Sequence, residues 1–343
     1  MRVNPVKSAK TSDGGELALI ERIRIRTARA SSRGLRLGIG DDCAILRPKP
    51  GEELTVTTDL SIAGRHFRLD WHPPEAIGHR TLARGLSDLA AMGARPIAAF
   101  LSLGLPRELT LSRSHQPAWI DRFLNGFLAL AETHRTPLAG GDLAESPIAV
   151  ADIVLVGAVP RGRALLRSGA RSGDLLYVTG DLGGAAAELS QLSALMAVKS
   201  APIGQFPAKI KYPLAPHLFP RPRIAQGLYL QRKRLATAAI DLSDGLSTDL
   251  AHLCAESGLA AEVVVAALPI HPNATLDQAL NGGEDYELLF TASSAAKLPS
   301  AIAGVPITPI GRIVRPRRGG STVTLLTSTG RRPLEAGGWQ HFS

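Results

Sequence analysis

The spacing of apolar and polar side chains predicts strands and helices in the first half of the chain. Residues 54–60, LTVTTDL, alternate apolar and hydroxyl side chains, which is typical of a strand that ends at Asp59. Residues 75–94 carry isoleucine and leucine at helical spacing and predict an amphipathic helix with Asp88 near its end. Residues 148–160, IAVADIVLVGAVP, predict another strand.

The second half of the chain repeats this alternation. Residues 174–192 predict a strand, a glycine turn and a helix, and the free N–H groups of the turn would suit an anion. Residues 238–258 predict a strand that passes into a helix with its leucines inward. Further strands are predicted at residues 261–270 and 307–314. Strands that alternate with helices in both halves predict the α/β class.

Length and composition indicate an ordinary globular protein. The 343 residues suggest about two domains, and residues 1–13 are expected to form a disordered tail. No run of 18 uncharged apolar residues predicts a transmembrane helix, and the N-terminus lacks the apolar core of a secretory signal. The two cysteines, Cys43 and Cys254, are expected to be small buried side chains of a cytoplasmic protein without disulfides.

The net charge of +9 leaves three interpretations open. Basic clusters could bind nucleic acid, form a solvated surface, or attract a phosphorylated substrate. We favour the solvated surface over nucleic acid, because no interleaved aromatic residues or zinc spacing accompany the basic clusters. We expect no nucleic-acid or membrane partner.

Acidic side chains gather in short stretches rich in small residues. Nine of the 30 acids follow this pattern: Asp41, Asp42, Asp59, Asp88, Asp142, Asp241, Asp244, Glu284 and Asp285. Like charges about 4 Å apart repel by ~4 kcal/mol at an effective dielectric of 20, so converging carboxylates need a cation. Oxygen ligands favour Mg²⁺ over zinc, and Mg²⁺ beside a basic chain indicates phosphate chemistry.

Purely structural interpretations stay open for these residues. Asp and Gly dominate ordinary turns, and Ser243 and Asp244 could be helix caps. His66 could be a partly buried histidine, Trp339 could cover an apolar patch, and Arg167 could be surface charge.

The order of the motifs resembles that of thiamine-monophosphate kinases. GIGDDCA, TTDLSIAGRHF, LSDLAAMGARP, GGD, RALLRSGARSGDLLYVTG, IDLSDGLSTDL, GGEDYELLF and GGWQHF follow one another between about residues 14 and 343. The resemblance implies a two-domain aminoimidazole ribonucleotide synthetase-like fold, with residues 14–160 as a dimerisation and Mg-ATP domain and residues 161–343 completing the site. It also implies a homodimer that uses ATP and several Mg²⁺ ions to convert thiamine monophosphate into thiamine diphosphate.

The same resemblance assigns roles to individual residues. It implies Mg²⁺ ligation by Asp42, Thr57, Thr58, Asp59, Asp88, Asp142, Asp241 and Asp244. It assigns ATP contacts to Gly141, Asp142, Arg167 and Ser243. It assigns thiamine contacts to His66, Glu284 and Trp339.

Two departures concern the ATP contacts. Leu143 replaces the usual threonine after GGD, and the GDLGG turn lacks the usual Asp-Ser. The sequence assigns Asp41 no role, and Asp285 and Glu287 none beyond turn and strand-edge structure. Another ATP-using enzyme of this superfamily, or a nucleotide-binding protein without turnover, is the alternative.

Overall fold

The computed structural model describes residues 15–28, 30–112, 117–198 and 216–339. The helices are α1 Glu16–Thr27, α2 Pro74–Ala91, α3 Trp119–Thr133, α4 Gly184–Val198, α5 Ile224–Lys233, α6 Leu246–Ser257 and α7 Leu276–Asn281. The strands are β1 Leu35–Leu37, β2 Ile45–Leu46, β3 Glu52–Ile62, β4 Arg95–Leu105, β5 Leu138–Glu145, β6 Val150–Pro160, β7 Leu175–Thr179, β8 Ala238–Asp241, β9 Ala260–Val264, β10 Leu288–Ala292, β11 Ala301–Ile302, β12 Val305–Val314, β13 Val323–Thr327 and β14 Gly330–Pro333. Short 3-10 turns lie at Arg107–Leu109, Arg167–Gly169 and Val265–Ala267.

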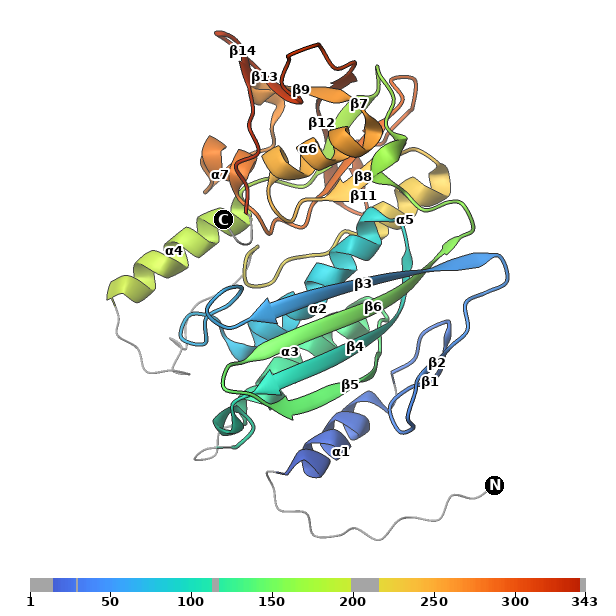
Figure 1. Cartoon of the computed structure of the whole chain (residues 1–343), viewed down its shortest axis with the longest axis vertical. Helices are drawn as coiled ribbons and strands as arrows, with labels where there is room; N and C mark the ends of the chain where they lie inside the picture. The colour runs from blue at the N-terminus through green and yellow to red at the C-terminus, as the bar shows by residue number, and fades with distance from the viewer. Residues whose placement is uncertain (1–14, 29, 113–116, 199–215, 340–343) are drawn as a thin grey trace.

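The N-terminal domain is built on a sheet with the strand order β3-β6-β4-β5. Figure 1 shows α2 and α3 on one side of this sheet, and α1 with the β1-β2 hairpin beside β5. The two long helices touch through glycines, because a Cβ on Gly126 would lie 1.8 Å from the Glu75 carbonyl oxygen. Close backbone contact between α2 and α3 therefore requires glycine at this crossing.

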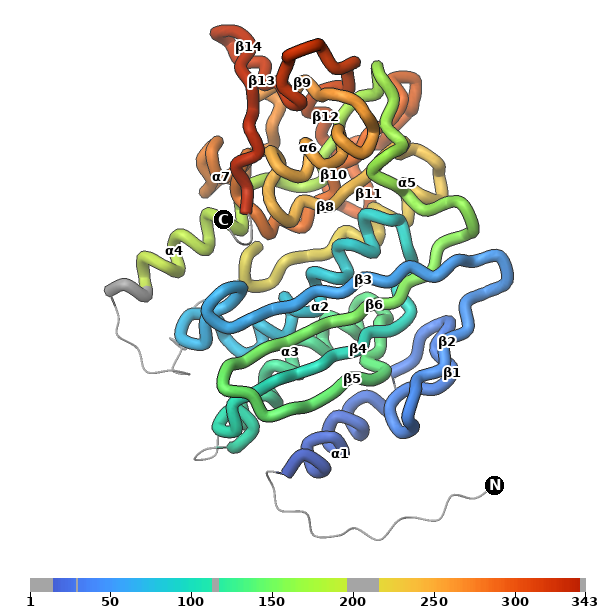
Figure 2. Tube along the Cα trace, in the orientation of Figure 1, coloured from blue at the N-terminus to red at the C-terminus, as the bar shows by residue number. Residues whose placement is uncertain are grey.

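The C-terminal domain is built on a second sheet, in the order β14-β13-β9-β12-β7-β10-β8 with β11 paired to β12. Its neighbouring strands are antiparallel except for β9 and β13, so the sheets are mixed rather than parallel. Figure 2 traces the passage of the chain from β6 in the first domain to β7 in the second. The fold is thus the expected mixed α/β architecture in two domains.

The two domains share a continuous apolar core. It includes Ile77 and Leu86 from α2, Leu230 from α5 and Phe290 from β10. A Cβ on Gly227 of α5 would lie 1.9 Å from the carbonyl oxygen of Ala90, so the helices meet backbone to backbone. Because α2 belongs to the first domain and contacts the second, residues on α2 can face both sides of a site between them.

Most predicted elements are confirmed, with three corrections. The strand at 54–60 continues to Ile62, so Asp59 lies inside β3 and not at its end. The strand expected at 261–270 ends at Val264 and passes into a 3-10 turn. Cys254 is buried as expected, whereas Cys43 is exposed. No helix in the described part of the chain is long and apolar enough to cross a membrane.

Candidate active site

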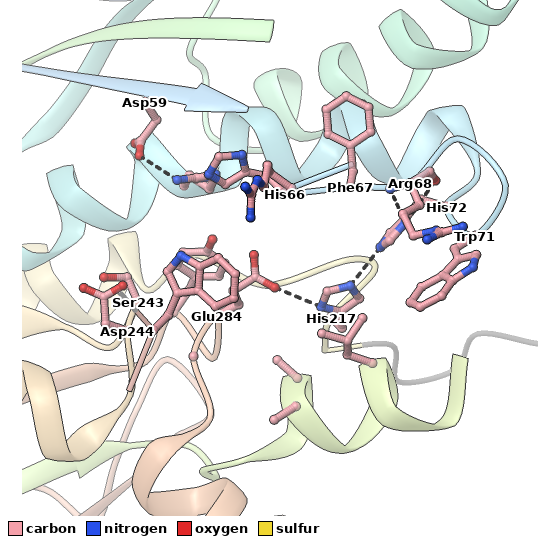
Figure 3. A pocket seen from close by; sticks show the side chains of 18 of the residues that line it. Asp59, His66, Phe67, Arg68, Trp71, His72, His217, Ser243, Asp244 and Glu284 are labelled. Carbon is pink, nitrogen blue, oxygen red and sulfur yellow. Dashed lines mark hydrogen bonds and ion pairs between the residues drawn. The ribbon is translucent and has the colours of Figure 1, made fainter. Parts of the chain in front are cut away.

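A cavity of about 480 Å³ lies between the two domains. Its walls come from β3 and the loop after it, from α2 and α4, and from the segments that precede α6 and β10 (Figure 3). Many of the predicted site residues line it: Asp59, His66, Asp88, Asp241, Ser243, Asp244, Glu284 and Trp339. Asp59 and Asp244 lie toward one end of the cavity, and Glu284 lies nearer to His217 (Figure 3).

The acidic end joins residues from both domains. Asp88 on α2 accepts a hydrogen bond from the Thr57 hydroxyl, and Ser87 donates one of 2.7 Å to Asp241 Oδ2 at the end of β8. Burial raises the pKa of Asp241 well above its usual range, and the charge of Asp88 adds to this effect. Burial likewise raises the pKa of Asp59 to about 6. Burial is the main cause of both shifts, so a cation bound beside these carboxylates would favour their charged forms.

Burial raises the pKa of Asp88, and the hydrogen bond from Thr57 and the charge of Arg167 oppose this rise, so the Arg167 charge also acts at this end. Thr58 behaves differently from its neighbours in β3. Side chains alternate along a strand, so Thr57 and Asp59 face α2, whereas Thr58 is exposed on the other face of the sheet. Its side chain does not join the cluster within this chain.

The loop between β8 and α6 is shaped by an acid that the sequence prediction missed. Asp249 Oδ2 accepts the backbone N–H groups of Ser243, Asp244 and Gly245 at 3.0 to 3.1 Å. The N-cap of α6 is Gly245, with φ of 115° and no side-chain cap, so the alternative that Ser243 or Asp244 caps the helix is wrong. The sequence pattern that could have indicated this role is an acid in the first turn of a helix that follows a glycine. Asp249 thus fixes the backbone of Ser243 and Asp244, two residues that line the cavity.

Glu284 is held by a buried polar cluster at the opposite end. Its Oε1 lies 2.6 Å from Nη2 of Arg80, and its Oε2 lies 3.1 Å from Nδ1 of His217. His217 Nε2 is 2.9 Å from Nε2 of His72 (Figure 3). Burial would raise the pKa of Glu284, but the positive charge of Arg80 and the hydrogen bond from His217 outweigh it and lower the pKa. Glu284 has φ of 69°, a strained conformation for a residue with a side chain.

Two further predicted side chains, those of His66 and Trp339, line the cavity. His66 Nδ1 accepts the backbone N–H of Ile62 at 3.1 Å, which fixes the ring against the end of β3. Trp339 keeps 51% of its surface exposed, and its backbone N–H donates to the Asp244 carbonyl oxygen at 3.1 Å. The indole is therefore presented to the cavity from a chain segment that is tied to the acidic end.

Asp285 and Glu287 each bind other groups of the protein. Asp285 accepts the backbone N–H groups of Gly183 and Ala185 at 2.6 and 3.1 Å, at the start of α4. The anion expected at the GDLGG turn is thus a side chain of this chain, and these N–H groups are not available to a ligand. Glu287 is buried, and it binds Arg223 and accepts a 2.5 Å hydrogen bond from Thr179.

The remaining predicted residues line a second cavity of about 410 Å³. Asp42, Gly141 and Asp142 meet there beside α1, together with Leu143. Gly141 pairs with Leu101, which pairs with Ile153, which pairs with Asp59, so Gly141 and Asp59 lie on opposite edges of the sheet. Three strand spacings separate them by roughly 14 Å. Asp42 and Asp142 therefore do not join the acidic end of the first cavity within one chain.

The donor set of the first cavity fits Mg²⁺. Its carboxylates offer hard oxygen atoms, and the Thr57 hydroxyl lies beside them on Asp88. Among the described residues no three acidic, histidine or cysteine side chains are placed to hold an ion by themselves. Mg²⁺ is usually bound by one or two carboxylates together with water and substrate phosphates, so this arrangement suits it.

Comparison with known proteins identifies the family. Residues 40–162 match "AIR synthase related protein, N-terminal domain", and residues 171–323 match the corresponding C-terminal domain. The thiamine-monophosphate kinase of Escherichia coli K12 is 40% identical over 311 residues, covering 87% of this chain and 90% of the relative.

Solved structures agree with this match. Thiamine-monophosphate kinase from Stenotrophomonas maltophilia K279a superposes with a TM-score of 0.75 and 38% identity, covering 94% of this chain and 97% of that one. A structure described as AaThiL complexed with AMPPCP and TMP has a TM-score of 0.72 and 28% identity, covering 98% and 100%. The chain belongs to the thiamine-monophosphate kinase family, within the AIR synthase related proteins.

Proposed function

We propose that this protein transfers the γ-phosphoryl group of ATP to thiamine monophosphate, giving ADP and thiamine diphosphate. The proposal rests on one observation, which is that the two ends of the first cavity differ in their side chains. An acidic end suited to metal and phosphates faces an end where Glu284, His66 and Trp339 can meet a cationic ring. The relatives named thiamine-monophosphate kinase, and the AaThiL complex with AMPPCP and TMP, support this pairing of substrates.

The residues proposed for metal and nucleotide are those at the acidic end and in the second cavity, together with Thr58 on the exposed face of β3. Asp42, Thr57, Thr58, Asp59, Asp88, Asp142, Asp241 and Asp244 would hold Mg²⁺ ions. Gly141, Asp142, Arg167 and Ser243 would contact ATP. When bound, Mg²⁺ neutralises charge on the phosphates of both substrates.

The chain itself has little covalent chemistry to perform. A phosphate acceptor is already ionised near neutral pH, so the site needs no strong general base. Glu284 and Trp339 would orient the thiamine ring, the first by charge and the second by stacking. Direct in-line attack then leaves no phosphorylated residue on the protein.

We also propose that the protein is a cytoplasmic homodimer that pairs through the first domain. The open face of the sheet presents Leu54, Val56 and Leu60 with 47%, 63% and 47% of their surface exposed. Alternate apolar side chains on a solvent-facing strand favour burial against a partner. Light scattering at micromolar concentration should give twice the 36.2 kDa chain mass. A 36.2 kDa species alone would contradict the pairing.

The function is tested by incubating the purified protein with Mg-ATP and thiamine monophosphate and separating the products by chromatography. We expect thiamine diphosphate and ADP in equal amounts. Asp244→Asn should nearly abolish turnover and keep the fold, whereas Glu132→Gln, an exposed acid on α3, should retain full activity. ATP turnover with another phosphate acceptor, and none with thiamine monophosphate, would instead indicate a different enzyme of the superfamily.

The thiamine contacts need a separate test. Trp339→Ala removes the indole and keeps the backbone hydrogen bond to Asp244. Loss of a cation–π contact of ~0.5–2 kcal/mol should raise the KM for thiamine monophosphate by about tenfold and leave the KM for ATP nearly unchanged. An unchanged KM for thiamine monophosphate would remove Trp339 from the site.

A further inference from the structure

One row of charged side chains on α2 runs along the wall of the first cavity. Arg80, Arg84 and Asp88 are spaced four residues apart and therefore share a face of the helix, about 6 Å from one to the next. Arg80 binds Glu284 at the end proposed for the thiamine ring. Asp88 binds Thr57 at the end proposed for metal. Arg84 lies between these two ends.

The surroundings of Arg84 suit an anion. Its side chain keeps only 18% of its surface exposed, yet it lines the cavity. Its Nη2 lies 3.3 Å from Asp59 Oδ1, and its Nη1 donates to Ser61 Oγ at 3.3 Å. Both contacts are long for a guanidinium, which makes its strong hydrogen bonds at 2.7 to 2.9 Å. Asp59 is moreover a proposed metal ligand, and an ion bound there would compete with Arg84 for the carboxylate.

The other arginines that line the cavity are placed differently. Arg68 makes two hydrogen bonds to Asp70, of 3.0 and 2.7 Å, and its guanidinium lies 4.5 Å from the ring centre of Trp71. Arg65 is exposed. Of these three lining arginines, Arg84 is the one set into the wall between Glu284 and the acidic end.

We propose that Arg84 binds the acceptor phosphate of the substrate and places it between the ring end and the metal end of the cavity. The inference rests on the proposed function, since it assumes that the substrate is a cationic ring carrying a phosphate. With the ring at Glu284 and the nucleotide at the acids, the acceptor phosphate must lie in the stretch that Arg84 faces. The planar guanidinium can bind two phosphate oxygens at once, which fixes the orientation of the attacking oxygen.

The test compares two ligands that differ only in the phosphate. Affinities for thiamine monophosphate and for thiamine are measured by calorimetry on the full chain, with Mg²⁺ present and without nucleotide, so that no turnover occurs. The variants are Arg84→Gln, Arg84→Lys and, as a matched control, Arg68→Gln, which also removes one positive charge from the cavity lining. Thermal melting of each variant checks that it is folded.

We expect Arg84→Gln to reduce the preference for thiamine monophosphate over thiamine by at least about tenfold, since a charge-assisted hydrogen bond is lost. The affinity for thiamine itself should change by less than about twofold, and Arg68→Gln should keep the wild-type preference. Arg84→Lys keeps the charge without the fork and should fall in between.

Some outcomes would overturn the proposal. Equal loss of affinity for both ligands would make Arg84 a structural partner of Asp59, and an unchanged preference would remove it from the phosphate site. Equal effects of Arg84→Gln and Arg68→Gln would indicate only the net charge of the cavity. If Arg84→Gln did not fold, an unchanged preference in Arg84→Lys would still refute a bidentate contact. A wild type that neither binds nor phosphorylates thiamine monophosphate would refute the proposed function itself.

Discussion

Replacing Glu284 by glutamine removes the carboxylate that Arg80 and His217 share. The Arg80 side chain keeps 5% of its surface exposed and the Glu284 side chain keeps 27%. Arg80 is therefore buried, whereas Glu284 is partly accessible to solvent. After the substitution Arg80 stays buried without its opposite charge. It would also face the cationic ring of the proposed substrate.

The size of the effect follows from burial. Breaking a buried ion pair by removing one partner costs about 3–5 kcal/mol. Because Glu284 is partly exposed and the glutamine amide keeps one acceptor oxygen, we expect a lower loss of about 2 kcal/mol in the free energy of unfolding. That loss corresponds to a fall of roughly 3 °C in the melting temperature. The KM for thiamine monophosphate should rise by about tenfold or more, since an attraction of at least ~1 kcal/mol is replaced by repulsion.

The pair is isolated by a double-mutant cycle with Arg80→Gln, Glu284→Gln and the double variant, followed by urea unfolding. The double variant removes both charges and should be more stable than the sum of the single losses predicts, with a coupling of about 1–2 kcal/mol. Glu53→Gln is a control, because Glu53 faces Arg161 at 3.9 Å on the surface and its loss should cost almost nothing.

The dependence on pH gives an independent check. The pKa of Glu284 is lowered in the fold, so its contribution to stability is present above the pKa of an unfolded glutamate, about 4.3, and disappears as the pH falls below it. The difference between wild type and Glu284→Gln should therefore be full at neutral pH and shrink in acid. A coupling near zero, or a difference that grows in acid, would refute this account of the cluster.

Three other predictions concern stability and metal. Burial raises the pKa of Asp285 to about 7, against the opposing hydrogen bonds from the start of α4, so the fold keeps a proton that the unfolded chain releases near pH 4. Wild-type melting temperature should fall as the pH rises from about 5 to 7.5, and Asp285→Asn should flatten this slope; an equal slope would argue against the shift. Gly126→Ala would place a Cβ 1.8 Å from the Glu75 carbonyl oxygen and should cost about 3 kcal/mol or more in urea unfolding, whereas Gly38→Ala, with contacts of 3.7 Å, should be tolerated. Mg²⁺ with an ATP analogue at 100 times its dissociation constant should stabilise the wild type by ~2.7 kcal/mol, and calorimetric melting should show a smaller gain for Asp244→Asn.

Local periodicity was enough to predict the elements that carry much of the site. Leucines at helical spacing placed Asp88 near the end of a helix, and α2 ends at Ala91. Alternation predicted β3 but not its length, because Ser61 and Ile62 belong to the strand only through their pairing with Ala151 and Val150 of β6. Strand ends are set by such distant partners, which a single segment of sequence does not contain.

The acids of GGEDYELLF show why residue roles were harder to predict than elements. Glu284 binds Arg80 of the first domain, Asp285 caps the start of α4, and Glu287 binds Arg223 and Thr179. The sequence prediction saw one cluster of like charges and could assign only the first to substrate. Asp285 and Glu287 instead meet partners about 60 to 110 residues away, and each is satisfied within the protein. Because burial without a partner is costly, every acid in a closed site must find a cation or donors, and the fold decides which acids remain for the ligand. Glu284 remains because one side of its carboxylate stays open to the cavity.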